Sequence, residues 1–313
     1  MKILVTGGTG LLGMDLCRRL SADHDLLGWA RRVPSAGAKP PCRFESVDVT
    51  SEEAVRQGIG RFRPELVVHC AGMTDVDACE RDPAAARLDN AAAVGRVASA
   101  CSAAGAVLLA VSTDYVFDGN SPRPYLEGDA PGPISAYGKS KLEGEQLALE
   151  LSPRVMVVRV SALFGAARRN FVSGAAQRLR AGEEVRAVTD QINSPSYTVD
   201  LAEGIARLIL PLRGDLAASS LGGPLHGVFH LANRGGASRF RVAEKIAAVL
   251  GKPMGLVRAV RWEDLGNPAK RPAQTELDCS RFAERVGEWL RPWEEALRFF
   301  LSNSGEVSDG KPS

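Results

Sequence analysis

Short apolar runs alternate with helix-like segments along the first half of the chain. The runs have the length and β-branched content of strands, and they are expected at 2–7, 25–32, 42–49, 65–72, 106–113 and 154–165. Helices are expected between them, at 11–23, 51–62, 83–105 and from 136 onward. Strands that alternate with helices favour βαβ units. The pattern therefore predicts an α/β fold, a doubly wound parallel sheet of the Rossmann type with a smaller C-terminal substrate-binding domain.

The second half of the chain is less regular. Helices are expected at 170–185, 200–210 and 238–251, a strand at 227–233, a loop at 190–200 and a surface connection at 211–227. We predict a dinucleotide-binding domain over 1–163, with a returning segment near 196–233. The rest of 164–302 is expected to be mainly a substrate-binding domain, and 303–313 a polar, disordered tail.

Composition narrows the class of protein. The chain is 45% apolar and 24% charged with a net charge of +2, so neither a broad basic surface nor a nucleic-acid partner is expected. No apolar stretch reaches about 18 residues and the N-terminus does not resemble a signal peptide, so we expect a cytoplasmic protein without membrane contact. The six cysteines show no CxxC spacing, which favours reduced structural thiols and predicts no metal site.

A glycine-rich turn follows the first expected strand. Gly7, Gly8, Gly10 and Gly13 satisfy both GxGxxG and GxxGxxG. Such spacing allows a tight turn, close approach of the backbone to a pyrophosphate, and free N–H groups at a helix N-terminus. The position of the turn between a strand and a helix predicts a dinucleotide site. The alternative is a glycine-rich turn without a ligand.

The end of the second expected strand bears on the choice of cofactor. NAD-binding folds usually carry an acidic residue there, whereas this chain has Arg31 and Arg32. Arginines at this place can pair with a 2′-phosphate, so NADPH is favoured and NADH stays an open alternative. Both arginines could instead simply be solvated. Asp48 and Val49 are expected at the adenine, and the small residues 71–73 along the dinucleotide.

A tyrosine and a lysine stand four residues apart, Tyr137 and Lys141, 24 residues after Thr113. Residues i and i+4 share one face of a helix, so the Lys141 ammonium is expected near the phenol and should lower its pKa. Thr113 closes the fifth strand and can hydrogen-bond a substrate carbonyl. A phenol that exchanges a proton with a carbinol oxygen beside a nicotinamide is the chemistry of a carbonyl reductase. An amphipathic helix face is the alternative explanation of the pair.

These motifs together resemble an extended short-chain dehydrogenase/reductase, and most closely the dTDP-4-dehydrorhamnose reductases. The matching strings run in family order from residue 7 to about 278: GGTGLLG, DVT, CAGMTDVDACERDP, Asn90 in LDNAAAV, VSTDYVFDG, YLEGDAPGPISAYGKSKLEGE, RVSALFG with NFV, DQINSPSY and RPAQTELD. The resemblance implies a catalytic trio of Thr113, Tyr137 and Lys141 and a role in dTDP-rhamnose or related carbohydrate biosynthesis. It implies dinucleotide contacts at Gly10, Leu11, Leu12, Asp48, Val49, Ala71, Gly72 and Met73, to which the turn adds Gly7.

The chain departs from the family pattern at several positions. Ala162 stands where the resemblance leads us to expect a tryptophan, Asn193 where glycine is common, and His69 where asparagine is usual. Tyr115 replaces the glutamate that serves as the base in related 4,6-dehydratases, so reduction is expected over elimination. The residues expected to contact the substrate are Thr113, Asp114, Ala162, Asn170 and Arg271, the last because a guanidinium suits a phosphate.

The leading hypothesis is therefore NADPH-dependent reduction of a nucleotide-linked 4-keto-6-deoxy sugar. One alternative is a sugar-nucleotide epimerase of the same fold. Another is a non-catalytic subunit resembling the regulatory subunit of methionine adenosyltransferase, although such a protein has no need of the trio. A homodimer is left open, and the sequence fixes neither the sugar nor its nucleotide.

Overall fold

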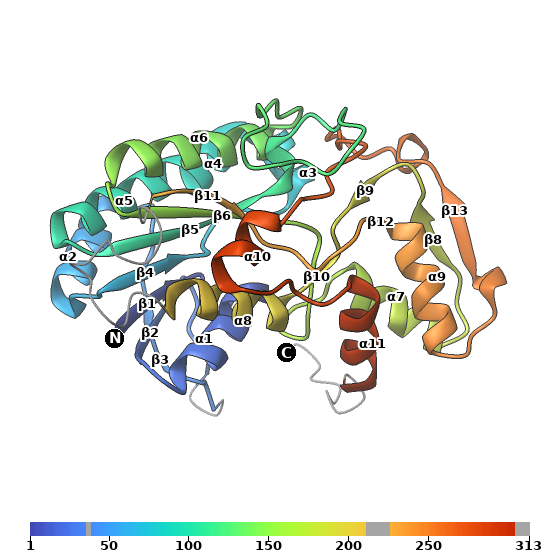
Figure 1. The fold of residues 1–313 in the computed structure, drawn as a ribbon, viewed down its shortest axis with the longest axis horizontal. Coiled ribbons are helices and arrows are strands. Elements are labelled where there is room, and N and C mark those ends of the chain that lie inside the picture. Colours follow the sequence, from blue (N-terminus) through green and yellow to red (C-terminus); the bar gives the residue numbers. More distant parts are fainter. Residues whose placement is uncertain (36–38, 211–225, 304–313) are drawn as a thin grey trace.

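A computed structural model describes residues 1–35, 39–210 and 226–303. It shows a larger lobe built on one extended sheet and a smaller lobe formed mainly by the C-terminal half of the chain (Figure 1).

The larger lobe is organised by a seven-stranded, all-parallel sheet in the order β3-β2-β1-β4-β5-β6-β11. Its strands are β1 Lys2–Thr6, β2 Asp25–Ala30, β3 Arg43–Ser46, β4 Leu66–His69, β5 Val107–Thr113, β6 Val155–Val160 and β11 Gly227–His230. The strand order reverses between β1 and β4, as in a doubly wound sheet. The predicted fold class is confirmed.

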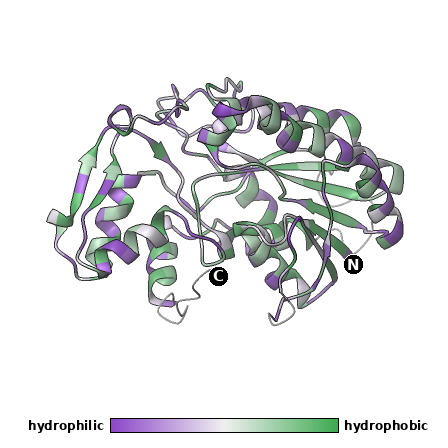
Figure 2. Cartoon of the chain, turned by 180° about the vertical axis from the view of Figure 1, so that it is seen from behind, coloured by the Kyte–Doolittle hydropathy of each residue, from purple (hydrophilic) through white to green (hydrophobic). Residues whose placement is uncertain are grey.

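Helices cover both faces of this sheet. On one face lie α1 Leu11–Ser21 and α8 Thr198–Ile209, and on the other lie α2 Glu52–Phe62, α5 Ala93–Ala104 and α6 Ala136–Leu151 (Figure 1). Each face of the sheet has a hydrophobic core, and alternate residues of β1 belong to one or the other. Ile3 and Val5 face α1, and Leu4 faces α2 and α5. The strands are largely hydrophobic because both of their faces are buried (Figure 2).

The alanine-rich helix expected at 83–105 is not uniform. It consists of α4 Pro83–Arg87, a π-helical turn η1 Leu88–Ala92, and α5. Within the π turn, the Asn90 side chain accepts a bond from the Met73 N–H (2.8 Å) and donates to the Met73 carbonyl (2.9 Å) and to Ser140 Oγ (3.1 Å). The turn therefore holds the segment that leads to the short helix α3 Val76–Arg81.

The strand expected at 154–165 is interrupted. β6 ends at Val160, and Ala162 has φ +43°, a left-handed conformation that breaks the ladder. The chain resumes as β7 Leu163–Phe164, which pairs with β10 Ser196–Tyr197 outside the main sheet. The segment expected as a loop at 190–200 thus contains β10 and also β9 Ile192–Asn193.

The smaller lobe has a core of its own, which includes Phe164, Leu179, Ile246, Trp293 and Phe300. The helix expected at 170–185 ends earlier and is followed by a strand. The elements of this lobe are α7 Phe171–Arg180, β8 Val185–Val188, β9, β12 Ala237–Ser238, α9 Arg239–Val249, β13 Val257–Val260 and α11 Trp293–Asn303. The sequence pattern predicted neither β8 nor the elements after residue 251.

Short elements complete the described chain: the 3₁₀ turns η2 Asp114–Val116, η4 Met254–Leu256 and η5 Glu263–Leu265, and the helix α10 Ser280–Val286. Asn303, expected to begin the tail, closes α11, and the remainder of the predicted tail lies outside the described residues. Most of the connection expected at 211–227 lies outside them as well, and the domain boundaries stay a prediction. Among the described helices, none combines the length and the apolarity needed to span a bilayer.

A buried ion pair fastens α6 to the sheet. Arg159 of β6 donates to Glu145 of α6 through Nε (2.9 Å) and Nη2 (2.7 Å), and the two side chains are only 5% and 3% exposed. The Arg159 guanidinium also lies 5.0 Å from the centroid of the Phe117 ring. Because α6 carries Tyr137 and Lys141, this pair fixes the helix on which the expected trio depends.

Removing one partner of this pair should be costly. Glu145→Ala leaves the Arg159 charge buried without a counter-charge and is expected to lower the free energy of unfolding by about 3–5 kcal/mol. Glu143→Ala is the control on the same helix, because Glu143 pairs with the exposed Arg87 and should cost less than about 1 kcal/mol. Urea unfolding of both variants measures the difference, and equal losses would contradict the assignment.

Candidate active site

A cavity of about 850 Å³ runs along the carboxyl ends of the parallel strands and continues to the smaller lobe. The glycine turn, the ends of β2, β4, β5 and β6, and the start of α6 form one side of it. Residues from α7, the β9–β10 segment and α9 form the other. This edge is where open α/β sheets bind their ligands.

The glycine turn has the shape that a pyrophosphate requires. Gly7 has φ +65°, and the Gly10 N–H donates to the Gly7 carbonyl at 2.8 Å. A Cβ at Gly13 would collide with the Gly7 carbonyl, so the close packing needs glycine. No side chain caps the N-terminus of α1, so its N–H groups stay available to an anion. Gly7, Gly10, Leu11 and Leu12, all predicted for the cofactor, line the cavity here.

The expected adenine end is also part of the cavity. Arg31, Arg32, Asp48 and Val49 line it, and the exposed Arg31 makes a 3.4 Å ion pair with Asp89. The Asp48 carboxylate accepts bonds from the N–H and hydroxyl of Thr50, and these bonds lower its pKa. These side chains can hold the adenosine part of a dinucleotide, with the arginines beside a 2′-phosphate.

Of the small residues predicted beyond β4, Ala71 and Gly72 line the cavity, whereas Met73 does not. The backbone of Met73 is taken up by its two hydrogen bonds with Asn90. A Cβ at Gly72 would lie 2.6 Å from Asn90 Oδ1, so this contact also requires glycine. The loop can therefore hold a flat part of the cofactor against backbone alone.

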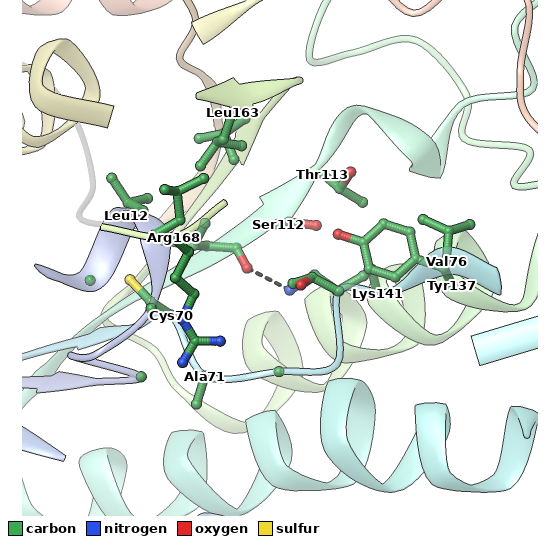
Figure 3. A pocket seen from close by; sticks show the side chains of 18 of the residues that line it. Leu12, Cys70, Ala71, Val76, Ser112, Thr113, Tyr137, Lys141, Leu163 and Arg168 are labelled. Atoms are coloured by element: carbon green, nitrogen blue, oxygen red, sulfur yellow. Dashed lines mark hydrogen bonds between the residues drawn. The ribbon is translucent and has the colours of Figure 1, made fainter. Parts of the chain in front are cut away.

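Thr113, Tyr137 and Lys141 are brought together at this edge (Figure 3). Thr113 ends β5, while Tyr137 and Lys141 lie one turn apart at the start of α6, whose N-cap Ser135 accepts a bond from the Gly138 N–H. The Lys141 Nζ donates to the Val111 carbonyl at 2.7 Å, which is the dashed line in Figure 3. The trio therefore lies beside the glycine turn, where a nicotinamide would reach.

The electrostatics of Tyr137 differ from the sequence-based prediction. Burial of the phenol raises its pKa, and a hydrogen bond with Thr113 opposes this shift only in part. Lys141 is not among the main influences on this pKa; its ammonium donates to the Val111 carbonyl, and burial lowers its own pKa. The prediction of a lowered Tyr137 pKa is wrong for this arrangement, and the phenol stays protonated at neutral pH.

Asp114 is a buried hydrogen-bond acceptor at the rim of the cavity. It accepts from the hydroxyls of Thr113 (3.1 Å), Ser161 (2.8 Å) and Thr275 (2.5 Å). Burial nevertheless raises its pKa to about 6. The Thr113 hydroxyl thus directs its proton to Asp114, and its oxygen accepts from the Tyr115 N–H at 3.2 Å. Asp114 lines the cavity, as expected of a substrate contact, and it orients Thr113.

Two of the expected substrate residues are not brought to this cavity. Asn170 caps α7, donating to the carbonyls of Gly165 (2.7 Å) and Arg168 (2.9 Å), so its amide is committed. Arg271 pairs with Asp77 at 2.9 Å, lies 4.6 Å from the Trp262 ring centroid, and lines a separate cavity of about 320 Å³. Ala162 does line the main cavity.

The sequence did not indicate that arginines of the smaller lobe line the cavity. Arg168, Arg169 and Arg239 line the cavity, and Arg168 Nε donates to the Thr9 carbonyl of the glycine turn at 3.2 Å. Figure 3 shows the Arg168 side chain reaching from the side of Leu163 toward Ala71. No spacing signal marks these residues, because their place follows from how the smaller lobe folds back. Across the described ranges, no group of three or more His, Cys, Asp or Glu residues could hold a metal ion.

Comparison with known proteins agrees with this geometry. Residues 1–305 match the family described as RmlD substrate binding domain. The chain is 38% identical over 296 residues to dTDP-4-dehydrorhamnose reductase of Streptomyces griseus, covering 94% of this chain and 91% of the relative. It is 32% identical to the spore coat polysaccharide biosynthesis protein SpsK of Bacillus subtilis, covering 98% and 99%.

Solved structures show the same likeness. The crystal structure of dTDP-4-dehydrorhamnose reductase from Bacillus anthracis in complex with NADP superposes with a TM-score of 0.83 at 32% identity, covering 96% of this chain and 98% of that chain. The UDP-glucose 4-epimerase of Thermotoga maritima reaches a TM-score of 0.81 at 19% identity, which shows a shared fold alone.

The glycine turn offers a test of the cofactor site. Gly13→Ala places a methyl group against the Gly7 carbonyl, so we expect NADP(H) affinity to fall by at least about 10-fold as the turn distorts. Gly60→Ala is the control, because nothing lies within 4 Å of its added Cβ and alanine suits a helix better than glycine. Fluorescence titration with NADPH measures both, and unchanged binding by Gly13→Ala would remove the turn from the site.

Proposed function

Because the chain belongs to the RmlD substrate binding domain family, whose members include NAD(P)-dependent sugar-nucleotide 4-ketoreductases, we propose that it reduces a nucleotide-linked 4-keto-6-deoxy sugar with NADPH. The observation that carries the proposal is the meeting of Thr113, Tyr137 and Lys141 beside the glycine turn. The proposed reaction resembles that of dTDP-4-dehydrorhamnose reductase.

The proposed chemistry divides simply between cofactor and protein. The residues of the glycine turn would hold NADPH, and the chemistry it would supply is a hydride for the carbonyl carbon. Tyr137 gives its proton to the carbonyl oxygen as the alkoxide forms, and its raised pKa keeps that proton in place beforehand. Lys141 keeps two N–H groups beyond its bond to Val111, and we assign them to the nicotinamide ribose. Thr113, held by Asp114, is hydrogen-bonded to the phenol and so orients it.

Tyr115 supports reduction over elimination. Its ring meets that of Tyr137 edge to face, with centroids 6.0 Å apart, so it lies next to the proposed proton donor. Burial raises its pKa to about 12, and a phenol with that pKa is not ionised at neutral pH. The residue that would abstract a proton in a dehydratase is thus replaced by one that cannot.

Activity measurements separate this proposal from its alternatives. NADPH oxidation with dTDP-4-keto-6-deoxy sugars is expected. An epimerase would hold oxidised cofactor and consume no NADPH. A regulatory subunit would bind a partner enzyme and reduce nothing.

Removing the phenolic hydroxyl should abolish the proton donor alone. Tyr137→Phe is expected to lower kcat by about 10²- to 10⁴-fold while leaving NADPH affinity unchanged. Tyr197→Phe is the control, because Tyr197 lies in the core of the smaller lobe, away from the cavity. Steady-state kinetics with matched thermal melts test both variants. A Tyr137→Phe enzyme with full activity would show that Tyr137 is not the proton donor.

The preference for NADPH should depend on the two arginines after β2. Replacing both Arg31 and Arg32 by alanine removes the charge facing a 2′-phosphate, so KM for NADPH should rise by about 10-fold or more and KM for NADH should stay unchanged. Arg43→Ala, an exposed arginine paired with Glu45, is the control. Equal changes in KM for NADPH and NADH would show that the arginines do not recognise the 2′-phosphate.

A further inference from the structure

The segment between β7 and α7 brings a cation of the smaller lobe to the glycine turn. Arg168 lies in this segment, and its Nε donates to the Thr9 carbonyl at 3.2 Å. The side chain is exposed, lines the cavity, and reaches from the side of Leu163 toward Ala71 (Figure 3). Within the described part of the chain, no carboxylate forms an ion pair with it. A positive charge without a counter-ion therefore lies where the pyrophosphate of a dinucleotide is expected.

The backbone of this segment is held at both ends. The Asn170 side chain donates to the Arg168 carbonyl (2.9 Å) and to the Gly165 carbonyl (2.7 Å). Gly165 packs so closely on Thr198 that an added Cβ would collide with Thr198 Oγ1. The Thr198 hydroxyl in turn donates to the buried Asp15 of α1 at 2.6 Å. The base of the segment is thus fixed against α1, and the Arg168 side chain reaches the N-terminal end of that same helix.

Arg168 supplies a charge that the glycine turn itself lacks. Residues 7–13 include no charged side chain, so the turn offers an anion only backbone N–H groups and the N-terminus of α1. A guanidinium has five N–H donors, and the bond to Thr9 uses one of them. The remaining donors suit two oxygens of a diphosphate, and such charge-assisted bonds are stronger than a bond to a neutral carbonyl.

The same segment leads directly into the substrate side of the cavity. It continues as α7, whose first residues, Phe171 and Val172, line the cavity, and Val172 belongs to the core of the smaller lobe. A contact that fixes Arg168 against the glycine turn therefore also fixes α7 relative to the sheet. Two ligands that favour one arrangement of the lobes strengthen each other's binding by the same factor.

We propose that Arg168 is a positioning residue that holds the cofactor diphosphate from the smaller lobe and thereby makes affinity for the substrate depend on bound cofactor. This inference rests on the proposed function. It gives the smaller lobe a second task, since the lobe then contributes to the cofactor site as well as to the substrate site.

Three variants of the full-length protein test the assignment. Arg168→Gln removes the charge, and Arg168→Lys keeps the charge but not the paired donors. Arg178→Gln is the matched control, because Arg178 lies on α7, is exposed, and pairs with Glu183 instead of lining the cavity. Calorimetric titration measures binding without turnover. The probes are NADP⁺, adenosine 2′-monophosphate, which has the 2′-phosphate but no diphosphate, and dTDP with and without saturating NADP⁺.

We expect Arg168→Gln to weaken NADP⁺ binding by about 5- to 10-fold and to leave the affinity for adenosine 2′-monophosphate unchanged. In the wild type, saturating NADP⁺ should raise the affinity for dTDP by about 5-fold or more. In Arg168→Gln, the affinity for dTDP should be the same with and without NADP⁺, and equal to that of the wild type without it. Arg168→Lys should retain part of both effects, and Arg178→Gln should behave as the wild type.

Several results would overturn the inference. They are unchanged NADP⁺ affinity in Arg168→Gln, an equal loss for adenosine 2′-monophosphate, coupling in Arg168→Gln as strong as in the wild type, or a wild-type protein that does not bind dTDP or binds it equally with and without NADP⁺. The proposed function fails separately. If no keto sugar is reduced while the coupling still depends on Arg168, the reductase assignment is wrong and this one stands. If reduction is normal and both affinities ignore Arg168, the reverse holds.

Discussion

The arrangement of the site depends on one buried carboxylate. Asp114 collects hydroxyl bonds from the end of β5, the end of β6 and the segment that contains Thr275. The network extends further, because Ser161 Oγ accepts from the Ser194 N–H and Ser194 Oγ accepts from the Leu277 N–H. A charge taken out of water is tolerated only when donors surround it. Separating these segments would leave that charge unsatisfied, so the lobes are held together at the reacting end of the cavity.

Helix α6 couples stability to chemistry in a similar way. Its first two turns carry Tyr137 and Lys141, and the next turn carries Glu145, which is bonded to Arg159 of the sheet. The same helix packs against α5 and the π turn. The reacting groups therefore sit on a rigid element whose anchor is one turn away, and little freedom remains for the phenol to lose when a substrate binds.

Local patterns in the sequence predicted the sheet of the larger lobe, although not the break after β6 or the π turn. Apolar runs of strand length, separated by helical segments, correctly predicted its sheet, and the glycine spacing and the i, i+4 pair were found at the cavity. The smaller lobe was harder, because two-residue strands such as β9 and β12 have no periodicity to detect. The arginines of the smaller lobe that line the main cavity were missed, and Arg271 lines a separate cavity, for the same reason: which arginine reaches the cavity depends on contacts between distant segments. The prediction that the Tyr137 pKa is lowered was wrong, because the spacing of residues reveals a neighbouring charge but not burial. Burial of the phenol has the larger effect and raises the pKa.

The π turn at Leu88–Ala92 restricts the deletion of residues from this part of the chain. A π turn holds one residue more than an α turn, and each residue advances a helix by about 100°. Deleting one residue there would let α4 and α5 merge into a regular helix that is easier to form, yet it would rotate Asn90 out of reach of Met73. The extra residue therefore interrupts the regular helix but lets Asn90 hold the loop after β4.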